Sequence, residues 1–287
     1  MQVIKDFDEY EILDMANGMK IEKWNNIILE RPDPQIIWTD KNNIDIWDKV
    51  DAKYNRSNTG GGSWEIKNKI PDSWTIKYKD LTFNLKLMGF KHTGLFPEQS
   101  YNWDIIIDKI KKEKRDIKVL NLFAYTGALS VAALSAGASV VHVDSSKGMV
   151  SWAKENVKLS NLEDKPIRFI IDDVIKFVKR EIRRGNKYDI IIMDPPSYGK
   201  GSNNEVWSVE KDLYNLVSDC TELLSDNPVM FLINSYTTGL SMTVLKNLLE
   251  LTVNKKFKGN IVTDELGIQM KDSNLILPCG IFARWER

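Results

Sequence analysis

The stretch "KVLNLFAYTGALSVAALSAGASVVHVD", residues 118 to 144, holds two apolar runs of strand length on either side of a segment of helical length. The first run covers residues 118 to 123, the second covers residues 139 to 144, and residues 127 to 136 fit a helix between them. Parallel sheets are built from this strand, helix and strand unit. The stretch therefore predicts an α/β fold.

The same rhythm continues to the last residues of the sequence. We expect further strands at residues 167–171, 188–194, 228–234, 259–266 and 278–286, and helices at residues 147–159, 173–184, 208–225 and 240–253. The central strands are continuous Ile and Val runs without polar alternation, which indicates burial on both faces of the sheet. The pattern predicts a doubly wound, Rossmann-like sheet of seven strands.

The first hundred residues have a different character. Short alternating runs such as "SWTIKYKDLTFNLKLMGF" are separated by turn-forming segments such as "ERPDP". This punctuation is typical of short strands and turns. We expect a smaller β-rich N-terminal domain over residues 1–98 and the Rossmann-like domain over residues 99–287.

Composition limits the class of protein. The 40 basic and 40 acidic side chains cancel, so a surface for nucleic acid would have to be a local patch. Two isolated cysteines do not make a disulfide framework or a metal site. Without a signal peptide or a membrane-spanning run, the sequence predicts a soluble, cytoplasmic protein with no metal and no membrane partner.

One short stretch, "DDVIKFVKREIRRG", is strongly basic. Its cations gather toward the end of a predicted helix, where they suit the helix dipole. We interpret it as a solvated helix face, with an RNA-facing patch as the alternative.

Ligands of open α/β sheets bind beyond the carboxyl ends of the strands. After the first strand, the loop carries a single glycine, Gly127, where a dinucleotide site would need G-x-G-x-x-G. Asp144 follows the second strand, where a carboxylate can accept ribose hydroxyls. Asp173 follows the third strand and can accept from the adenine amine, although either acid alone could equally cap a helix. Adenine, ribose and no phosphate together indicate S-adenosylmethionine.

The sequence resembles the class I S-adenosylmethionine-dependent methyltransferases. It is most similar to the bacterial rRNA large-subunit methyltransferase group, through the motifs "NLFAYTG", "VDSSKGMVSWAKEN" and "DPPSYGKG" and the upstream segments "LDMANGMKIEKWNNIILERPDPQIIW" and "FKHTGLFPEQSYNW". Within that group it resembles the members without the RNA-binding PUA domain. The resemblance implies the seven-stranded class I methyltransferase sheet.

The resemblance also implies roles for individual residues. Asp144 would hold the ribose with Ser145 beside it, and Asp173 would hold the adenine amine. Gln99 corresponds to a position over the cofactor, followed here by Ser100 and Tyr101 in place of basic residues. The methionine part of the cofactor would be lined by Asn121, Phe123, Ala124, Tyr125, Thr126 and Gly127.

The fourth strand ends at Asp194, followed by Pro195 and Pro196. Prolines stiffen the backbone there, so the Asp194 carboxylate and the Pro195 carbonyl are suited to hold an acceptor N–H, and Tyr198 could stack on a flipped base. Methylation of carbon 5 of a pyrimidine needs an attacking thiolate. No cysteine follows the fourth or fifth strand, so we expect methylation at a nucleobase nitrogen, with Cys220 and Cys279 as packing residues.

The sequence therefore predicts a methyltransferase that acts on ribosomal RNA. A methyltransferase for a small molecule or a protein is the first alternative, favoured by the zero net charge. A nucleotide-binding module without catalysis, or a nicotinamide enzyme, is the alternative from another class. The sequence does not specify an oligomeric state.

Overall fold

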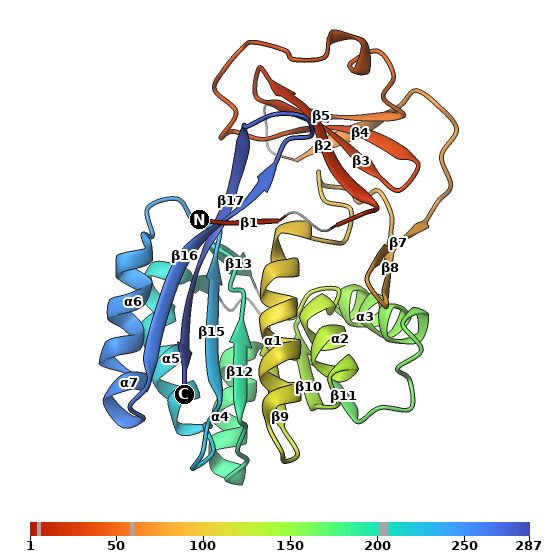
Figure 1. Ribbon diagram of the computed structural model, residues 1–287. Coiled ribbons are helices and arrows are strands. Elements are labelled where there is room, and N and C mark those ends of the chain that lie inside the picture. The colour runs from red at the N-terminus through yellow and green to blue at the C-terminus, as the bar shows by residue number, and fades with distance from the viewer. Residues whose placement is uncertain (5–6, 58–60, 201–205) are drawn as a thin grey trace. The chain divides into compact units, whose positions relative to one another are not determined.

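The computed structural model describes residues 1–4, 7–57, 61–200 and 206–287, so Gly201 of the "DPPSYGKG" motif lies outside the described residues. The chain folds into two compact units. The first contains Met1 and residues 102–265 and 280–287, and the second contains residues 2–101 and 266–279. Figure 1 shows the first unit as the helix-covered sheet and the second as the strands drawn mostly in red and orange.

The first unit is built on a mostly parallel sheet. Its strands lie in the order β16, β17, β15, β12, β9, β10 and β11. Their bounds are Lys118–Leu122 (β9), Ser139–Asp144 (β10), Ile167–Ile171 (β11), Ile190–Met193 (β12), Met230–Ser235 (β15), Asn260–Gln269 (β16) and Ile276–Glu286 (β17). All seven expected strands are present and the predicted fold class is confirmed, although among the described residues an eighth strand, β1 (Gln2–Ile4), continues the sheet beside β16.

The strand order reverses at β9. This strand pairs in parallel with β10 on one side and with β12 on the other. β17 runs antiparallel to β15. The reversal places the ends of β9 and β12 next to each other, and such a switch point is where open α/β sheets bind ligands.

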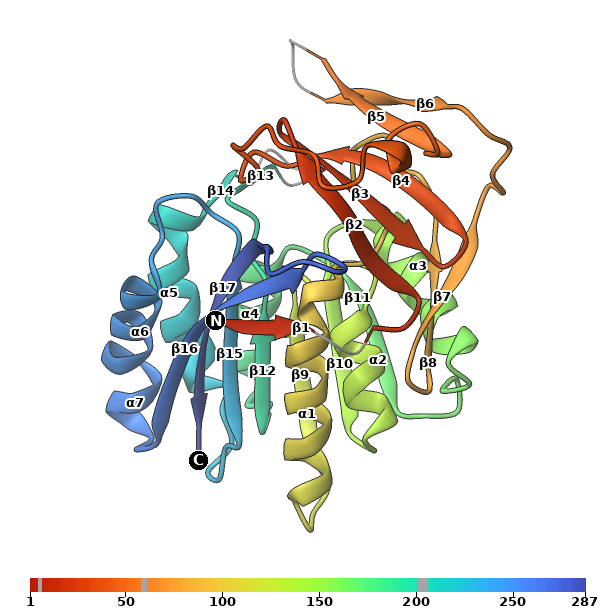
Figure 2. The same ribbon diagram turned by 45° about the horizontal axis from the view of Figure 1, so that its top comes forward.

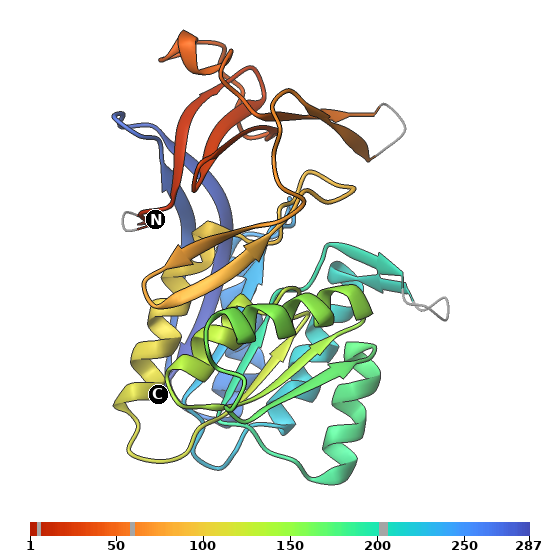
Figure 3. The same ribbon diagram turned by 90° about the vertical axis from the view of Figure 1, so that its right-hand side faces the viewer.

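Helices cover both faces of this sheet, with α1, α2 and α3 on one side and α4, α5 and α6 on the other (Figures 1 and 3). Their bounds are Ser100–Lys112 (α1), Ala128–Ser135 (α2), Lys147–Leu159 (α3), Val174–Arg184 (α4), Val209–Glu222 (α5), Met242–Leu251 (α6) and Val253–Lys256 (α7). None of the helices in the described ranges is long and apolar enough to cross a membrane.

Three elements were not expected from the sequence. Helix α1 buries Trp103, Ile106 and Ile110, an i, i+3, i+7 stripe that lies among many charged residues. Helix α7 has only one turn. The third element is a short antiparallel hairpin of β13 (Tyr198–Lys200) and β14 (Val206–Ser208), whose strands are too short to show an alternating pattern.

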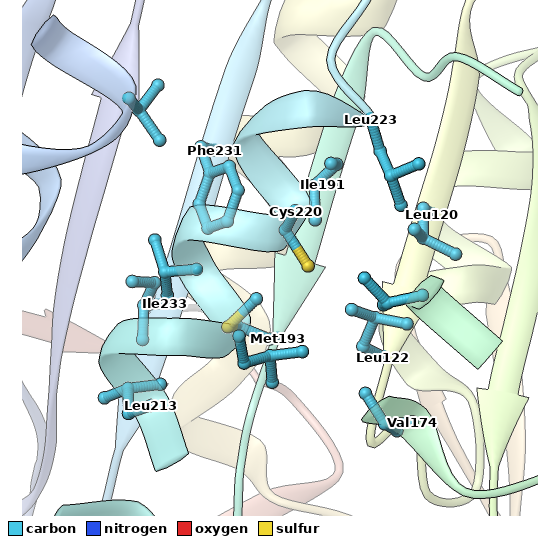
Figure 4. Close-up of a cluster of buried hydrophobic side chains, with 14 of the residues drawn as sticks. Leu120, Leu122, Val174, Ile191, Met193, Leu213, Cys220, Leu223, Phe231 and Ile233 are labelled. Carbon is cyan, nitrogen blue, oxygen red and sulfur yellow. The ribbon is translucent and has the colours of Figure 1, made fainter. Parts of the chain in front are cut away.

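An apolar cluster fills the space between the sheet and helices α4, α5 and α6 (Figure 4). Leu120 and Leu122 of β9, Ile191 and Met193 of β12 and Phe231 of β15 all contribute fully buried side chains. Cys220 of α5 lies in the same cluster and is also fully buried. The cluster holds the central strands in place beneath their carboxyl ends.

A buried carboxylate joins the amino ends of the same strands. Asp189 accepts hydrogen bonds from the backbone N–H of Lys118 (2.9 Å), from Arg115 Nη1 (2.8 Å) and from Ser225 Oγ (2.7 Å). These partners precede or begin β9 and β15, while Asp189 itself immediately precedes β12. Asp189 therefore fixes the amino ends of three segments of the sheet together.

The second unit is rich in strands, as expected for the N-terminal part. A five-stranded sheet is formed by β2 (Tyr10–Ala16), β3 (Met19–Trp24), β4 (Ile27–Pro32), β5 (Ala52–Arg56) and β6 (Gly62–Ile66) (Figure 2). A separate hairpin joins β7 (Trp74–Tyr78) to β8 (Leu81–Leu85), and β1 (Gln2–Ile4) pairs with residues 266–268 of β16. The short turns η1 (Ile44–Ile46) and η2 (Pro97–Gln99) complete the unit.

A buried ion pair crosses the five-stranded sheet. Glu22 on β3 accepts from Arg31 Nη2 (2.8 Å) and from the Tyr10 hydroxyl (2.6 Å). Burial opposes ionisation of Glu22, but Arg31 and Lys20 lower its pKa to about 2. The carboxylate is therefore charged at any physiological pH and links three neighbouring strands.

Replacing Phe231 by alanine tests the packing of the sheet. Phe231 is fully buried in the cluster of Figure 4, so we expect Phe231→Ala to lower the free energy of unfolding by about 3–5 kcal/mol. Tyr214 on α5 is a matched aromatic control because it is 52% exposed, and Tyr214→Ala should change stability by no more than about 0.5 kcal/mol. Urea unfolding followed by circular dichroism measures both. Equal losses in the two variants would contradict this description of the core.

Candidate active site

The loop from β9 to α2 has an unusual backbone. Phe123 (φ 53°), Tyr125 (φ 51°) and Gly127 (φ 83°) all adopt the left-handed backbone conformation, which residues other than glycine rarely adopt. Gly127 is also required by packing, since a Cβ atom there would lie 2.9 Å from Ala153 Cβ and 3.3 Å from His142 Cε1. Strained backbone conformations of this kind are found mainly at ligand sites, and they persist only where surrounding interactions stabilise them.

Three hydrogen bonds hold this loop. The Ala124 N–H donates to the Val143 carbonyl of β10 (3.0 Å), and the Tyr125 N–H donates to Asp144 Oδ2 (2.8 Å). From α3, the Asn156 side chain donates to the Thr126 carbonyl (2.8 Å). The loop is therefore anchored to both the neighbouring strand and the next helix, while the Phe123 and Tyr125 side chains are only half-buried.

Asp144 connects this loop to the turn after β10. Its second oxygen, Oδ1, accepts from the Ser146 N–H (2.8 Å). Burial raises the pKa of Asp144, although the two backbone N–H donors act in the opposite direction. Each carboxylate oxygen can accept a second hydrogen bond, so the group can still receive two ribose hydroxyls. The adjacent Ser145 is exposed.

Asp173 serves as the N-cap of α4. Its Oδ1 accepts from the Lys176 N–H (2.9 Å), which is the helix-capping role that a sequence cannot distinguish from ligand binding. The preceding Asp172 is paired with Arg180 of the same helix. Contact of Asp173 with an adenine amine through its other oxygen stays a prediction.

Behind the loop runs a buried chain of polar groups. Asn121 Nδ2 donates to Ser130 Oγ (3.0 Å), and Ser130 Oγ lies 3.0 Å from His142 Nδ1. The hydroxyl of Ser130 thus links Asn121 of β9 to His142 of β10 through α2. Asn121 is thus engaged beneath the loop, and its predicted contact with the cofactor stays a prediction.

The turn after β12 lies beside this loop. Asp194 is half-buried and Pro195 is buried, whereas Tyr198 of β13 is 57% exposed. Trp207 of β14 donates its indole N–H to the Pro196 carbonyl (2.6 Å), and its ring packs on Phe123 with centroids 5.1 Å apart. Trp207 therefore joins the "DPP" turn to the loop after β9.

The end of β15 adds a buried amide pair. Because Met193 pairs with Ile233, Asn234 lies opposite Asp194 at the next position of the register. Asn234 Oδ1 accepts from Asn102 Nδ2 of α1 (3.0 Å), and Ser235 Oγ accepts from the Thr237 N–H (3.2 Å). Asn234 and Ser235 are both buried, so they support the edge of the site and do not line its surface.

Other predicted groups lie elsewhere. Gln99 belongs to the second unit, where it is buried at the end of η2, and its role over the cofactor stays a prediction. Cys220 is in the core of the first unit and Cys279 is in the second unit, so neither follows β12 or β15. Across the described ranges, no three His, Cys, Asp or Glu side chains gather into a group that could hold a metal ion.

Sequence reasoning missed Trp207, Ser130, His142 and Asn102. It did point to Asn234 and Ser235, either as contacts for the target base or as residues that close the strand and cap the next helix. Trp207 stands in a strand of three residues, and the other three side chains are polar groups buried inside helices or strands. The only available signal was polarity at positions that the strand and helix patterns assign to the core, because buried polar groups need partners.

Comparison with known proteins bears on the family and the fold of the chain. The chain matches the family model described as S-adenosylmethionine-dependent methyltransferase over residues 49–246. It is similar in structure to the crystal structure of the SAM-dependent methyltransferase from Agrobacterium tumefaciens, with a TM-score of 0.94, 34% identity, and coverage of 99% of this chain and 92% of that one. A Streptococcus mutans chain described as a putative SAM-dependent methyltransferase has 22% identity and a TM-score of 0.73 over 98% of this chain and 76% of that one, a likeness of fold.

Curated relatives carry a more specific name. The ribosomal RNA large subunit methyltransferase K/L of Colwellia psychrerythraea is 31% identical, over 66% of this chain and 26% of that protein. The protein of the same name from Shewanella frigidimarina is 36% identical, over 66% of this chain and 26% of that protein. The chain thus spans about a quarter of the length of these relatives.

Asparagine at position 173 separates capping from cofactor recognition. Asn caps helices about as well as Asp, so we expect Asp173→Asn to leave the free energy of unfolding within about 0.5 kcal/mol of the wild type. The asparagine side chain has an NH₂ group where Asp173 has a charged carboxylate oxygen. Because this charged acceptor is lost, Asp173→Asn should bind S-adenosylhomocysteine about tenfold more weakly. Calorimetric titration and thermal unfolding measure the two effects. Asp173→Ala is the control that should lose stability as well, and unchanged affinity in Asp173→Asn would restrict Asp173 to capping.

Burial of His142 makes stability depend on pH. Burial lowers the pKa of His142 to about 3, against 6.5 in an exposed chain, so between these values the unfolded state binds a proton that the folded state does not. The contribution of neutral His142 to the free energy of unfolding is fully present above about pH 6.5. Below that pH it falls by about 1.4 kcal/mol for each pH unit, down to about pH 3.

We therefore expect His142→Gln to unfold with a shallower dependence on pH than the wild type between pH 6.5 and 4.5, measured by urea unfolding at several pH values. His92, whose pKa burial lowers to about 4, is a second case of the same effect, and His92→Gln should also flatten the profile. Parallel wild-type and His142→Gln profiles would contradict the expected titration.

Proposed function

Because the chain belongs to the family of S-adenosylmethionine-dependent methyltransferases, we propose that it transfers a methyl group from this cofactor to a base of ribosomal RNA. The observation that carries the proposal is the "DPP" turn at the switch point, which Trp207 joins to the strained loop after β9. The names of the curated relatives support RNA as the acceptor. Ribosomal RNA as acceptor implies action in the cytoplasm.

The residues after β9, β10 and β11 fit the cofactor. Asp144 would accept the ribose hydroxyls, Asp173 the adenine amine, and the loop from Phe123 to Gly127 would hold the methionine part. A single-glycine loop fits a ligand that has no phosphate. When bound, the cofactor supplies a methyl group on a sulfonium, which is a strong electrophile.

The protein's own residues have to align the acceptor. For a direct displacement, the protein's residues would have to hold the acceptor nitrogen against the methyl group that the bound cofactor would supply. The Asp194 carboxylate would accept a hydrogen bond from the acceptor N–H and then its proton, and the Pro195 carbonyl would fix the orientation. The exposed Tyr198 ring would stack on the flipped base.

The two cysteines argue for nitrogen as the methylated atom. Attack on carbon 5 of a pyrimidine needs a thiolate at the base. Burial raises the pKa of Cys220 well above its usual value, and burial beside Glu98 does the same for Cys279. Neither thiol ionises at neutral pH, and Cys220 is enclosed among apolar side chains (Figure 4).

Transfer of label from S-adenosylmethionine to rRNA that lacks modifications tests this function. We expect methylation by the wild type, full activity in the Cys220→Ser/Cys279→Ser variant, and about a hundredfold slower transfer in Asp194→Asn through lost alignment. Mass spectrometry of the digested RNA should locate the methyl group on a base nitrogen.

Binding of S-adenosylhomocysteine and the melting temperature serve as controls for all variants. Loss of activity in the double serine variant with intact folding would reject the nitrogen acceptor. Label that appears only in a metabolite or protein extract would reject RNA and assign the enzyme to the alternative acceptor classes.

A further inference from the structure

The first unit has a pocket at the edge of the sheet opposite to the "DPP" turn. It has a volume of about 340 Å³ and lies at the amino ends of β9, β10 and β11 and at the entry to β12. Its lining combines three cations, Lys118, Arg168 and Lys187, with apolar groups that include Val140 and Ile167. None of the lining residues is acidic.

One wall of this pocket is held rigidly from behind. Glu181 of α4 is fully buried and accepts from the Tyr188 hydroxyl (2.5 Å), from Asn186 Nδ2 (2.8 Å) and from Arg184 Nη1 (3.0 Å). Burial opposes its ionisation, but these donors hold the pKa of Glu181 below its usual value. The carboxylate is therefore charged, satisfied by its donors, and fixes Tyr188 and Asn186 in the pocket wall.

The cations of the pocket are not neutralised by nearby acids. Among the residues that the structure describes, Lys118 and Arg168 have no ion-pair partner for their side chains, and Lys187 Nζ donates to the Glu222 carbonyl (2.6 Å). Two carboxylates next to the pocket have partners of their own: Asp189 accepts from Arg115 and Ser225, and Glu181 behind the wall is paired with Arg184. The pocket is therefore a local positive site on a chain with zero net charge.

We propose that this pocket binds the phosphate group of a nucleotide, with the phosphodiester backbone of the RNA substrate as its source. The planar Arg168 guanidinium matches phosphate oxygens in a bidentate geometry, Lys118 and Lys187 add point charges, and the apolar floor accommodates the sugar. A protein without a global positive field needs such a local contact to hold RNA.

The position of the pocket fits a substrate larger than one base. Strands of five residues separate it from the carboxyl ends of the sheet by about 16 Å, at about 3.3 Å for each residue. The last turn of α4 adds Arg183 and Arg184 just before Asn186 of the pocket. A folded RNA could therefore place its reacting base at one edge of the sheet and a phosphate at the other. The choice of RNA as source rests on the proposed function, whereas phosphate binding itself does not.

Charge removal in the pocket tests the proposal. We expect Lys118→Gln/Arg168→Gln to bind a fluorescently labelled fragment of unmodified rRNA about tenfold more weakly than the wild type, and to lower the slope of log affinity against log salt by about two. The matched control, Lys255→Gln/Lys258→Gln, removes two exposed cations at and after α7 and should leave both quantities unchanged. Binding of S-adenosylhomocysteine should be equal in all three proteins.

Adenosine monophosphate, titrated into the same proteins, identifies the source of the phosphate. A loss of RNA affinity confined to the pocket variant assigns the site to the RNA backbone. If the pocket variant loses affinity for adenosine monophosphate but not for RNA, the site binds a free nucleotide, and RNA is overturned as the source of the phosphate. No loss for either probe, or an equal loss in the control variant, overturns the pocket as a phosphate site, even where the wild type methylates RNA.

Discussion

The candidate site depends on the parallel pairing of β9 with β10 on one side and with β12 on the other. This reversal of strand order brings the loop after β9, the Asp144 carboxylate and the "DPP" turn to one edge of the sheet. The pairing is stabilised at two levels, since Asp189 joins the amino ends of the strands and the apolar cluster with Phe231 packs along their length. Chemistry at this edge therefore depends on packing in the middle of the sheet.

The polar groups of the first unit fall into two kinds: buried groups that bond to other parts of the protein, and partly exposed groups that a ligand can reach. Glu181 and the Asn102–Asn234 pair are buried and have partners inside the protein, so they position neighbouring elements. Asp144 and Asp194 are only partly buried, which leaves part of each carboxylate accessible to a ligand. Trp207 belongs to both groups, because its indole holds the "DPP" turn while its ring supports Phe123.

The sequence predicted the fold well where the apolar pattern was unambiguous. The seven strands and five of the helices of the α/β unit begin and end within a few residues of the expected positions. It failed at α1, where the buried stripe through Trp103 is diluted by charges, and at the β13–β14 hairpin, whose strands of three residues carry no periodicity. The strand-end acids were found because their place in the motif is local. Ser130, His142 and Asn102 could not be found, since their partners lie far away in the sequence or on other elements.

The left-handed conformations of Phe123, Tyr125 and Gly127 also bear on the kinetics and energetics of ligand binding. Folding has already ordered this loop through bonds to β10 and α3, so its conformational entropy is lost before any ligand arrives. A ligand that meets a preformed loop has no ordering cost to offset, and its association does not wait for a rearrangement of the chain. The strained backbone of Phe123 and Tyr125, held together with the Gly127 turn, thus gives this edge of the sheet a rigid loop that is already ordered before a ligand binds.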